Sequence, residues 1–257
     1  MKILVLGDCH VDDEQDLSRF SLASQLILDH KPEHIVIIGD FLTLNCLSRW
    51  DRDKRLKMEG KRYSKEIEAG NISLDMLLSG IDFYNDKRRE GKRSLYKPSI
   101  VYIEGNHEER LKRYLESDPT FEGFVSIEKD LHLRERNISY IPYREYYYIN
   151  DIGFTHIPHN KVKPVDGLDV CRKVSAVTVK STVFGHTHSM NVSNFHKEGQ
   201  DHLQQILNVG CFISKKEDYV HGRVTEYWRG LVLLDSWKPG RFDIETFSLG
   251  RLERLYQ

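Results

Sequence analysis

Three short apolar runs in the first half of the chain each lead into a glycine, and polar residues follow. They are Lys2–Leu6 before Gly7, His34–Ile38 before Gly39, and Ser99–Ile103 before Gly105. Continuous apolar runs of this length are typical of strands that are buried on both faces. Apolar residues at helical spacing separate the runs, in Asp16–His30 and from about Asn71 to Arg89. The resulting β-α-β-α-β order predicts an α/β fold with a sheet that is at least partly parallel.

The second half of the chain has a different rhythm. After Ile138, short apolar runs favour strands, and the only clear helical interval lies near Val170–Val179. The expected strands are Tyr146–Ile149, Gly153–Thr155, Thr182–Phe184, Gln204–Val209, Leu231–Leu234 and Phe242–Phe247. Two sheets packed face to face, with helices outside, would bury both halves. Because the sequence has no repeat or Gly/Ser linker, we expect one domain over residues 1–257, with a basic helical insertion at about 51–97.

Composition narrows the class of protein. The formal net charge of -1 does not favour nucleic-acid binding through overall charge. No apolar run approaches the roughly 20 residues that cross a bilayer, so we expect a soluble, cytoplasmic protein without a membrane partner. The cysteines lack a C-x-x-C pair, which favours reduced thiols over a zinc finger or disulfide scaffold. They are Cys9, Cys46, Cys171 and Cys211.

Polar side chains that can bind metal follow the apolar runs. They are Asp8 with His10, Asp40, Asn106, His156, and His186 with His188. Ligands of open α/β sheets bind at the carboxyl ends of the strands, so five segments can deliver these groups to one point. The spacing of Asp8 and His10, repeated by His186 and His188, places both side chains on one face if the chain there is extended.

The donor set indicates which metals to expect. Imidazole and carboxylate donors without thiolate suit manganese, iron, zinc or nickel better than calcium or an iron–sulfur cluster. Seven donors are too many for one tetrahedral site, but they suffice for two ions that share a carboxylate. In such sites, two ions about 3.5–4 Å apart activate a water as hydroxide and offset charge on the attacked group. We therefore predict two divalent ions, Mn²⁺ first, with iron, zinc, nickel or magnesium as alternatives.

Taken in order, the motifs resemble those of the calcineurin-like metallophosphoesterase superfamily, including its small capless members in bacteria and phages. The family pattern is present as GDCH, GD, GNHE, TH and GHTH over residues 7–188. This resemblance implies the metallo-dependent phosphatase fold, a four-layer α/β/β/α sandwich of two mixed sheets flanked by helices. It also implies hydrolysis of a phosphate ester by a hydroxide that bridges the two metals.

The resemblance also assigns a role to each candidate residue. Asp8, His10 and His188 would bind one metal, and Asn106, His156 and His186 would bind the other. Asp40 would bridge the two ions, and His107 would lie beside the substrate phosphate as a general acid or charge stabiliser. Asp40 and His107 are thus the expected catalytic residues. Histidine suits that role because its pKa lies near neutrality.

Two departures from the family pattern leave alternatives open. The usual His-Gly motif is replaced by His156-Ile157-Pro158-His159, so His159 competes with His156 as a ligand. The Asp-Arg-Gly motif of phosphoprotein phosphatases is absent. Thr43 stands where many members have Asp or Asn, and Arg49 is the nearest substitute for the missing arginine. These differences weaken the interpretation as a phosphoprotein phosphatase.

Basic segments suggest the substrate class. Two segments are rich in Lys and Arg, Arg52–Lys65 and Lys87–Lys97. Such a segment forms a solvated face or contacts a phosphate-rich substrate. The interleaved aromatics Trp50, Tyr63, Tyr84 and Tyr96 could stack on bases. The basic segment after GNHE, Arg110–Leu115, resembles the segment at the same place in small family members that are often nucleases or nucleotidases. We expect a phosphate-ester substrate that is a nucleotide or nucleic acid; the alternatives are a phosphoprotein phosphatase and a catalytically silent scaffold.

Overall fold

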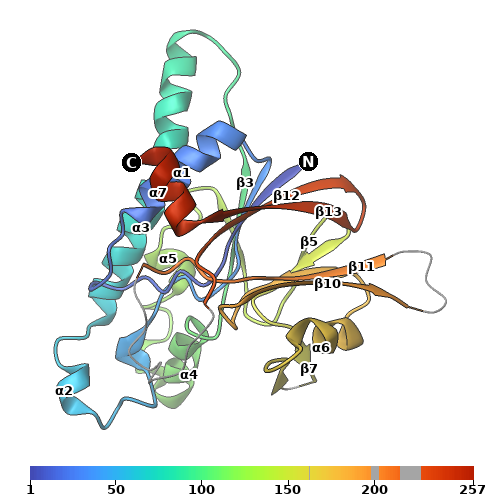
Figure 1. Cartoon of the computed structure of the whole chain (residues 1–257). Coiled ribbons are helices and arrows are strands. Elements are labelled where there is room, and N and C mark those ends of the chain that lie inside the picture. Colours follow the sequence, from blue (N-terminus) through green and yellow to red (C-terminus); the bar gives the residue numbers. More distant parts are fainter. Residues whose placement is uncertain (162, 198–202, 215–226) are drawn as a thin grey trace.

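Two large sheets pack face to face, and helices cover the outer face of each (Figure 1). The computed structural model describes residues 1–161, 163–197, 203–214 and 227–257. The first sheet has the order β13-β12-β1-β2-β3-β4. Its strands are β1 (Lys2–Leu6), β2 (His34–Ile37), β3 (Ser99–Ile103), β4 (Ile138–Ile141), β12 (Gly230–Lys238) and β13 (Arg241–Ser248). The strands β1 to β4 pair in parallel, whereas β12 is antiparallel to both of its neighbours, so the sheet is mixed.

The second sheet is also mixed and has the order β10-β11-β9-β6-β5. Its strands are β5 (Tyr147–Ile149), β6 (Ile152–Phe154), β9 (Ser181–Phe184), β10 (Met190–His196) and β11 (Leu203–Val209). The strands β6 and β9 pair in parallel, so both end at the same edge. A separate ribbon joins β7 (His159–Asn160) to β8 (Lys163–Pro164).

The helices divide between the two sheets. On the side of the six-stranded sheet lie α1 (Arg19–His30), α2 (Arg55–Met58), α3 (Tyr63–Glu90), α4 (Glu109–Ser117), α5 (Ile127–Asp130) and α7 (Leu249–Tyr256), with the short 3-10 turns η1 (Asn45–Leu47) and η2 (Pro119–Phe121). The five-stranded sheet carries α6 (Val170–Val177). In the described part of the chain, no helix combines the length and apolar character needed to cross a membrane.

Strand alternation divides the core into layers. In β1, Leu4 and Leu6 pack against the helices, whereas Ile3 and Val5 pack between the two sheets. Successive side chains of a strand point to opposite faces, which explains why the whole run is apolar. A third cluster joins α6 to the outer face of the second sheet. These three cores separate four layers and confirm the predicted α/β/β/α sandwich.

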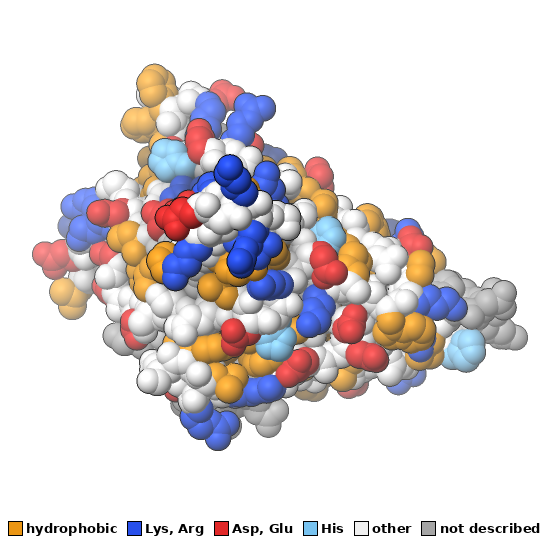
Figure 2. Space-filling view, turned by 90° about the horizontal axis from the view of Figure 1, so that it is seen from above, with side chains coloured by type: hydrophobic (Ala, Val, Ile, Leu, Met, Phe, Trp, Pro, Cys, Tyr) orange, Lys and Arg blue, Asp and Glu red, His pale blue; other side chains and the backbone are white. Residues whose placement is uncertain are grey.

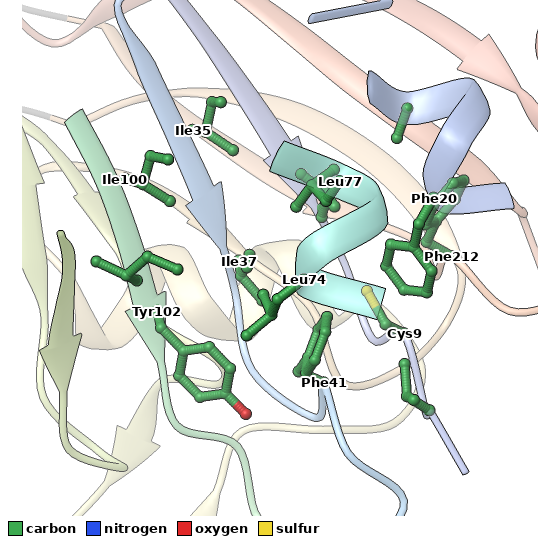
Figure 3. Packing of buried hydrophobic residues seen from close by; sticks show 14 of the residues in the cluster. Cys9, Phe20, Ile35, Ile37, Phe41, Leu74, Leu77, Ile100, Tyr102 and Phe212 are labelled. Carbon is green, nitrogen blue, oxygen red and sulfur yellow. The ribbon is translucent and has the colours of Figure 1, made fainter. Parts of the chain in front are cut away.

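The crossover from β2 to β3 contains the longest helix, α3. It begins at Tyr63, eight residues before the expected start, because buried residues such as Ile67 extend the packed face toward its amino end. Leu74 and Leu77 belong to the cluster that covers the six-stranded sheet, and Figure 3 shows Leu74 directed toward Ile37 of β2. The segment 51–97 therefore contains a helix that is part of the main core. The sequence analysis did not anticipate β4, β10 or α7.

A core substitution tests how much α3 contributes to stability. Leu77 is fully buried, and we expect Leu77→Ala to lower the free energy of unfolding by about 2–5 kcal/mol because it leaves a cavity. Ile72→Ala is the matched control on the same helix, because Ile72 is 45% exposed; its cost should stay below about 1 kcal/mol. Urea titrations measure both. Equal, small costs would identify α3 as a peripheral insertion.

Candidate metal centre

The candidate ligands meet where strands of both sheets end. Segments that follow β1, β2 and β3 of the first sheet and β6 and β9 of the second come together there. The donors brought together are the side chains of Asp8, His10, Asp40, Asn106, His156, His186 and His188. Asp8 and His156 have no exposed surface, whereas Asn106 and His186 are partly exposed, so the centre is buried on one side and accessible on the other.

One group of donors combines side chains from the segment after β1 with one from the segment after β9. Nε2 of His10 lies 3.0 Å from Nε2 of His188, and the latter lies 3.6 Å from Oδ1 of Asp8. The backbone N–H of His186 donates to both oxygens of Asp8, at 2.8 and 3.0 Å. The strand-end turns are thereby tied together through the Asp8 carboxylate.

A second group surrounds His156. Its Nε2 lies 3.0 Å from Oδ1 of Asn106 and 3.3 Å from Nδ1 of His186. Its Nδ1 faces the carbonyl oxygen of Ile38 at 3.1 Å, and an N–H donated there leaves Nε2 with a lone pair toward the other donors. Oδ2 of Asp40 lies 3.4 Å from this Nε2. The same oxygen lies 3.9 Å from Nε2 of His10, in the first group.

The spacing of these atoms fits two divalent ions. Bonds of about 2.0–2.1 Å in a tetrahedral site separate the ligand atoms by roughly 3.3 Å. The observed separations of 3.0 to 3.9 Å in both groups are of that size. Asp40 is the carboxylate within reach of both groups, as a bridging ligand must be. Cys9 instead packs in the helix-side core, where Figure 3 shows it, so no thiolate joins the described donors.

The backbone at the centre differs from the expected extended conformation. Positive φ angles occur at His10 (45°), Asp40 (45°), His186 (73°) and His188 (58°). The extended conformation that would place each pair on one face is therefore not present, because Asp8–His10 and His186–His188 lie in irregular segments beyond the strands. A left-handed backbone costs a residue with a Cβ about 1–2 kcal/mol. Contacts such as the 2.9 Å hydrogen bond from His10 N–H to the Asp40 carbonyl hold these turns.

The glycine of the GNHE motif permits a close approach. A Cβ on Gly105 would lie 2.1 Å from Oδ1 of Asp40, which no side chain could tolerate. Gly185 is constrained in the same way by Oδ2 of Asp8, at 2.3 Å. These glycines are therefore needed to bring the turns against the carboxylates.

A model of the calcineurin-like phosphoesterase family matches residues 1–190, which include all seven donors. The chain belongs to that family. Membership supports a metal-dependent phosphoesterase, and it agrees with the α/β/β/α sandwich and the clustered donors. The sequence shows no significant similarity to a curated protein.

Solved structures of similar fold accompany the family match. Vps29 from Entamoeba histolytica in complex with zinc is 15% identical, with a TM-score of 0.43, over 97% of this chain and 99% of that chain. Vps29 from Chaetomium thermophilum is 13% identical, with a TM-score of 0.44, over 96% of each chain. The protein TT1561 from Thermus thermophilus is 9% identical, with a TM-score of 0.48, over 96% of this chain and 98% of that chain.

The protonation states of the donor side chains follow from burial and mutual contact. Burial opposes ionisation of Asp40, but His156 and His107 outweigh it and hold the pKa of that carboxyl well below its usual range. Burial also opposes protonation of His156, yet Asp40 and Asp8 raise the pKa of that imidazole to about 9. Burial, together with His107 and His188, lowers the pKa of His10 well below its usual range. Without metal, the His156 imidazole is therefore positively charged at neutral pH.

His107 lies beside the centre and contacts different partners. Its Nδ1 faces the carbonyl oxygen of Thr43 at 2.7 Å, and its Nε2 lies 3.8 Å from Oδ2 of Asp40. A guanidinium nitrogen of Arg110 lies 3.0 Å from the same Nε2. A cation at this position disfavours a metal ion on Nε2 but suits an anionic substrate. Arg110 was not among the predicted site residues, although its i, i+3 spacing from His107 was a usable signal.

His159, the alternative to His156, lies outside the donor groups. Its Nδ1 faces the carbonyl oxygen of Ile157 at 3.0 Å, and its Nε2 lies 3.3 Å from the hydroxyl of Tyr143. The fold thus places His156 among the candidate ligands, at the end of β6, and His159 in the ribbon strand β7.

Glu108 holds the loops of the centre in place. One carboxylate oxygen accepts hydrogen bonds from the backbone N–H groups of Asp40 (3.1 Å) and Gly105 (2.9 Å). The other accepts from the N–H of Leu42 (2.8 Å) and the hydroxyl of Tyr102 (3.0 Å). The sequence analysis assigned no role to Glu108. A buried carboxylate with four donors instead fixes the turn that carries Asp40.

Metal binding should release a proton from His156. Since the ion needs the neutral ring and the pKa is about 9, a lower pH favours the proton over the ion. We expect apparent Mn²⁺ affinity to rise about tenfold per pH unit between pH 6.5 and 8. Calorimetry in buffers of different ionisation enthalpy measures the protons released. His159→Ala is the control and should release the same number; no release at pH 7 in the wild type would refute the assignment.

Glu108→Ala tests the loop clamp. The substitution leaves three buried backbone N–H groups without their acceptor, and we expect it to lower the free energy of unfolding by about 3 kcal/mol or more. Metal affinity should fall as well, because the turn at Asp40 loosens. Glu116→Ala on the exposed face of α4 is the control. If chemical denaturation gave equal stability for both variants, the clamp would be excluded.

Proposed function

We propose that the chain hydrolyses phosphate esters of nucleotides or nucleic acid at a two-metal centre. The observation that carries the proposal is Asp40, a single carboxylate oxygen within 3.9 Å of donors from both groups. Nε2 of His107 lies 3.8 Å from that oxygen, and Arg110 contacts the same ring nitrogen, where an ester bound at the centre would meet both side chains. Mn²⁺ is the ion that we propose first, with iron, zinc, nickel or magnesium as alternatives.

The proposed ligand sets are Asp8, His10 and His188 for one ion, and Asn106, His156 and His186 for the other. Asp40 would be shared by both. Two bound ions would offset the negative charge of the phosphoryl oxygens and lower the pKa of a water molecule. The protein contributes a fixed arrangement of donors that is largely buried.

His107 and Arg110 would act on the substrate directly. The guanidinium of Arg110 can donate two parallel hydrogen bonds to a phosphate. Burial lowers the pKa of His107 to about 4, although Asp40 opposes that shift, so the ring is neutral in the free protein. A phosphate anion near Nε2 favours the protonated ring. The ring could then hold a proton at Nε2 for the leaving oxygen, while Thr43 fixes its orientation through Nδ1.

Hydrolysis of p-nitrophenyl phosphate and bis(p-nitrophenyl) phosphate with added Mn²⁺ tests the proposal and separates monoesterase from diesterase activity. We expect Asp40→Asn and His107→Ala each to lower kcat/KM by about 100-fold or more. His159→Ala should stay within about threefold of the wild type, because His159 lies outside both donor groups.

Three outcomes would contradict the proposal. Wild-type rates in both Asp40→Asn and His107→Ala would exclude this centre. Activity on phosphopeptides without activity on nucleotides would identify a phosphoprotein phosphatase. Stoichiometric metal binding without hydrolysis of any ester would identify a scaffold.

A further inference from the structure

A cavity of about 370 Å³ lies between η1 and α4, on the side of His107 where Arg110 lies. Arg110 connects the cavity to His107, because it lines the cavity and its guanidinium lies 3.0 Å from Nε2 of His107. Figure 1 shows α2 and α4 at the lower end of the molecule, which this cavity shares. Its charged and aromatic lining consists of Arg49, Arg52, Arg110, Arg113, Trp50 and Tyr114. Of the described residues that line it, none is Asp or Glu.

The arginines of the cavity are only partly neutralised. Arg113 pairs with Glu109 on the same helix. The nearby carboxylate of Asp51 is taken up by Lys54 at 2.7 Å and Lys57 at 3.0 Å. Within the part of the chain that the structure describes, Arg49 and Arg52 form no ion pair. The cavity therefore offers positive charge beyond the position of the scissile phosphate, which suits a second anionic group.

Aromatic surface lies beside this charge. Trp50 is 88% exposed and Tyr114 is 41% exposed, and both contribute to the wall. Trp50 stands in the chain between the neighbouring Arg49 and Asp51, so its indole and the Arg49 guanidinium come from one short segment. An exposed indole next to arginines is a stacking platform for a base, and stacking tolerates any base because each has a π-face.

The wall of the cavity is fixed from the core. Glu66 of α3 is fully buried, and its carboxylate accepts hydrogen bonds from the backbone N–H groups of Asn45 (3.0 Å) and Cys46 (2.9 Å) in η1. The opposite wall is α4, which begins directly after the GNHE motif. Both walls are therefore positioned before a ligand arrives. The volume lies near the lower end of the range for small-molecule sites, enough for about one nucleotide.

The other basic segment lies far from this cavity. The last turn of α3 carries Lys87, Arg88 and Arg89. It forms the upper tip of the molecule in Figure 1, and Figure 2 shows Lys and Arg side chains gathered around that tip. Of the two basic segments, only Arg52–Lys65 contributes residues to the lining of the cavity.

We propose that the cavity binds one nucleotide unit of the substrate, adjacent to the phosphate that is hydrolysed. Arg49 and Arg52 would bind a second phosphate, and Trp50 would stack on the base. Arg110 would contact the phosphate at the metal centre. This assignment rests on the proposed function and deepens it, because it defines the substrate as a base linked to two phosphates, free or at the end of a strand.

Calorimetric binding to the Mn²⁺-loaded full chain tests the assignment without relying on turnover. The probes are adenosine 3′,5′-bisphosphate, AMP and inorganic phosphate. We expect the bisphosphate to bind about tenfold or more tightly than AMP, and AMP about tenfold more tightly than phosphate, in line with one added charge contact and one stacked base. A 5′-phosphorylated dinucleotide that binds more tightly still would identify a strand end as the source.

Two variants separate the contributions. Trp50→Ala should remove the advantage of AMP over phosphate, and the double variant Arg49→Ala, Arg52→Ala should remove the advantage of the bisphosphate over AMP. Arg254→Ala, an exposed arginine on α7, is the control and should keep both advantages. Circular dichroism would show that each variant is folded.

Equal affinity of the wild type for all three probes would overturn the assignment, as would unchanged ratios in both cavity variants. These results are distinct from failure of the proposed function. Ester hydrolysis without preference among the probes would overturn only the cavity, whereas the expected preferences without any hydrolysis would overturn only the catalytic proposal.

Discussion

The buried carboxylate of Asp40 is the constraint around which the molecule is arranged. A charge in the interior is expensive unless partners surround it. Here His156 lies 3.4 Å from Oδ2, and the backbone N–H of His107 donates to Oδ1 at 2.9 Å. Glu108 then holds the backbone of Asp40 itself. Imidazoles surround the charged Asp40, whereas burial and the charge of Asp40 raise the pKa of Glu108 to about 7 despite its backbone donors.

Metal binding at these residues would be coupled to folding. The turns that carry the ligands are held in left-handed conformations, and the donors are crowded together although they compete for the same protons. Ions of positive charge would relieve both the excess of negative charge at Asp8 and Asp40 and the competition for protons at His156. The contacts that make the centre costly to fold without metal therefore also suit it to bind metal. The apolar cores beside the strands supply the folding free energy that offsets this cost.

The helix α3 connects the core to the cavity. Its apolar face covers the six-stranded sheet, and one buried carboxylate on it, Glu66, fixes the wall of the cavity. Arg110 on α4 reaches both the cavity and His107. The candidate metal centre and the cavity are thus positioned by the same two helices.

The sequence by itself determined the strands that lead into the site, the glycines that follow them and the donor types at their ends, because these are local features of apolar runs and turns. It also determined the family and hence the four layers. Only the tertiary structure decided that His156 rather than His159 faces Asn106, that the donor pairs lie in left-handed turns, and that Glu108 clamps Asp40. The early start of α3 and the contact of Arg110 with His107 likewise emerged only in the fold. Each of these depends on how segments distant in the chain pack, and no local pattern of residues specifies the distance between two strand ends.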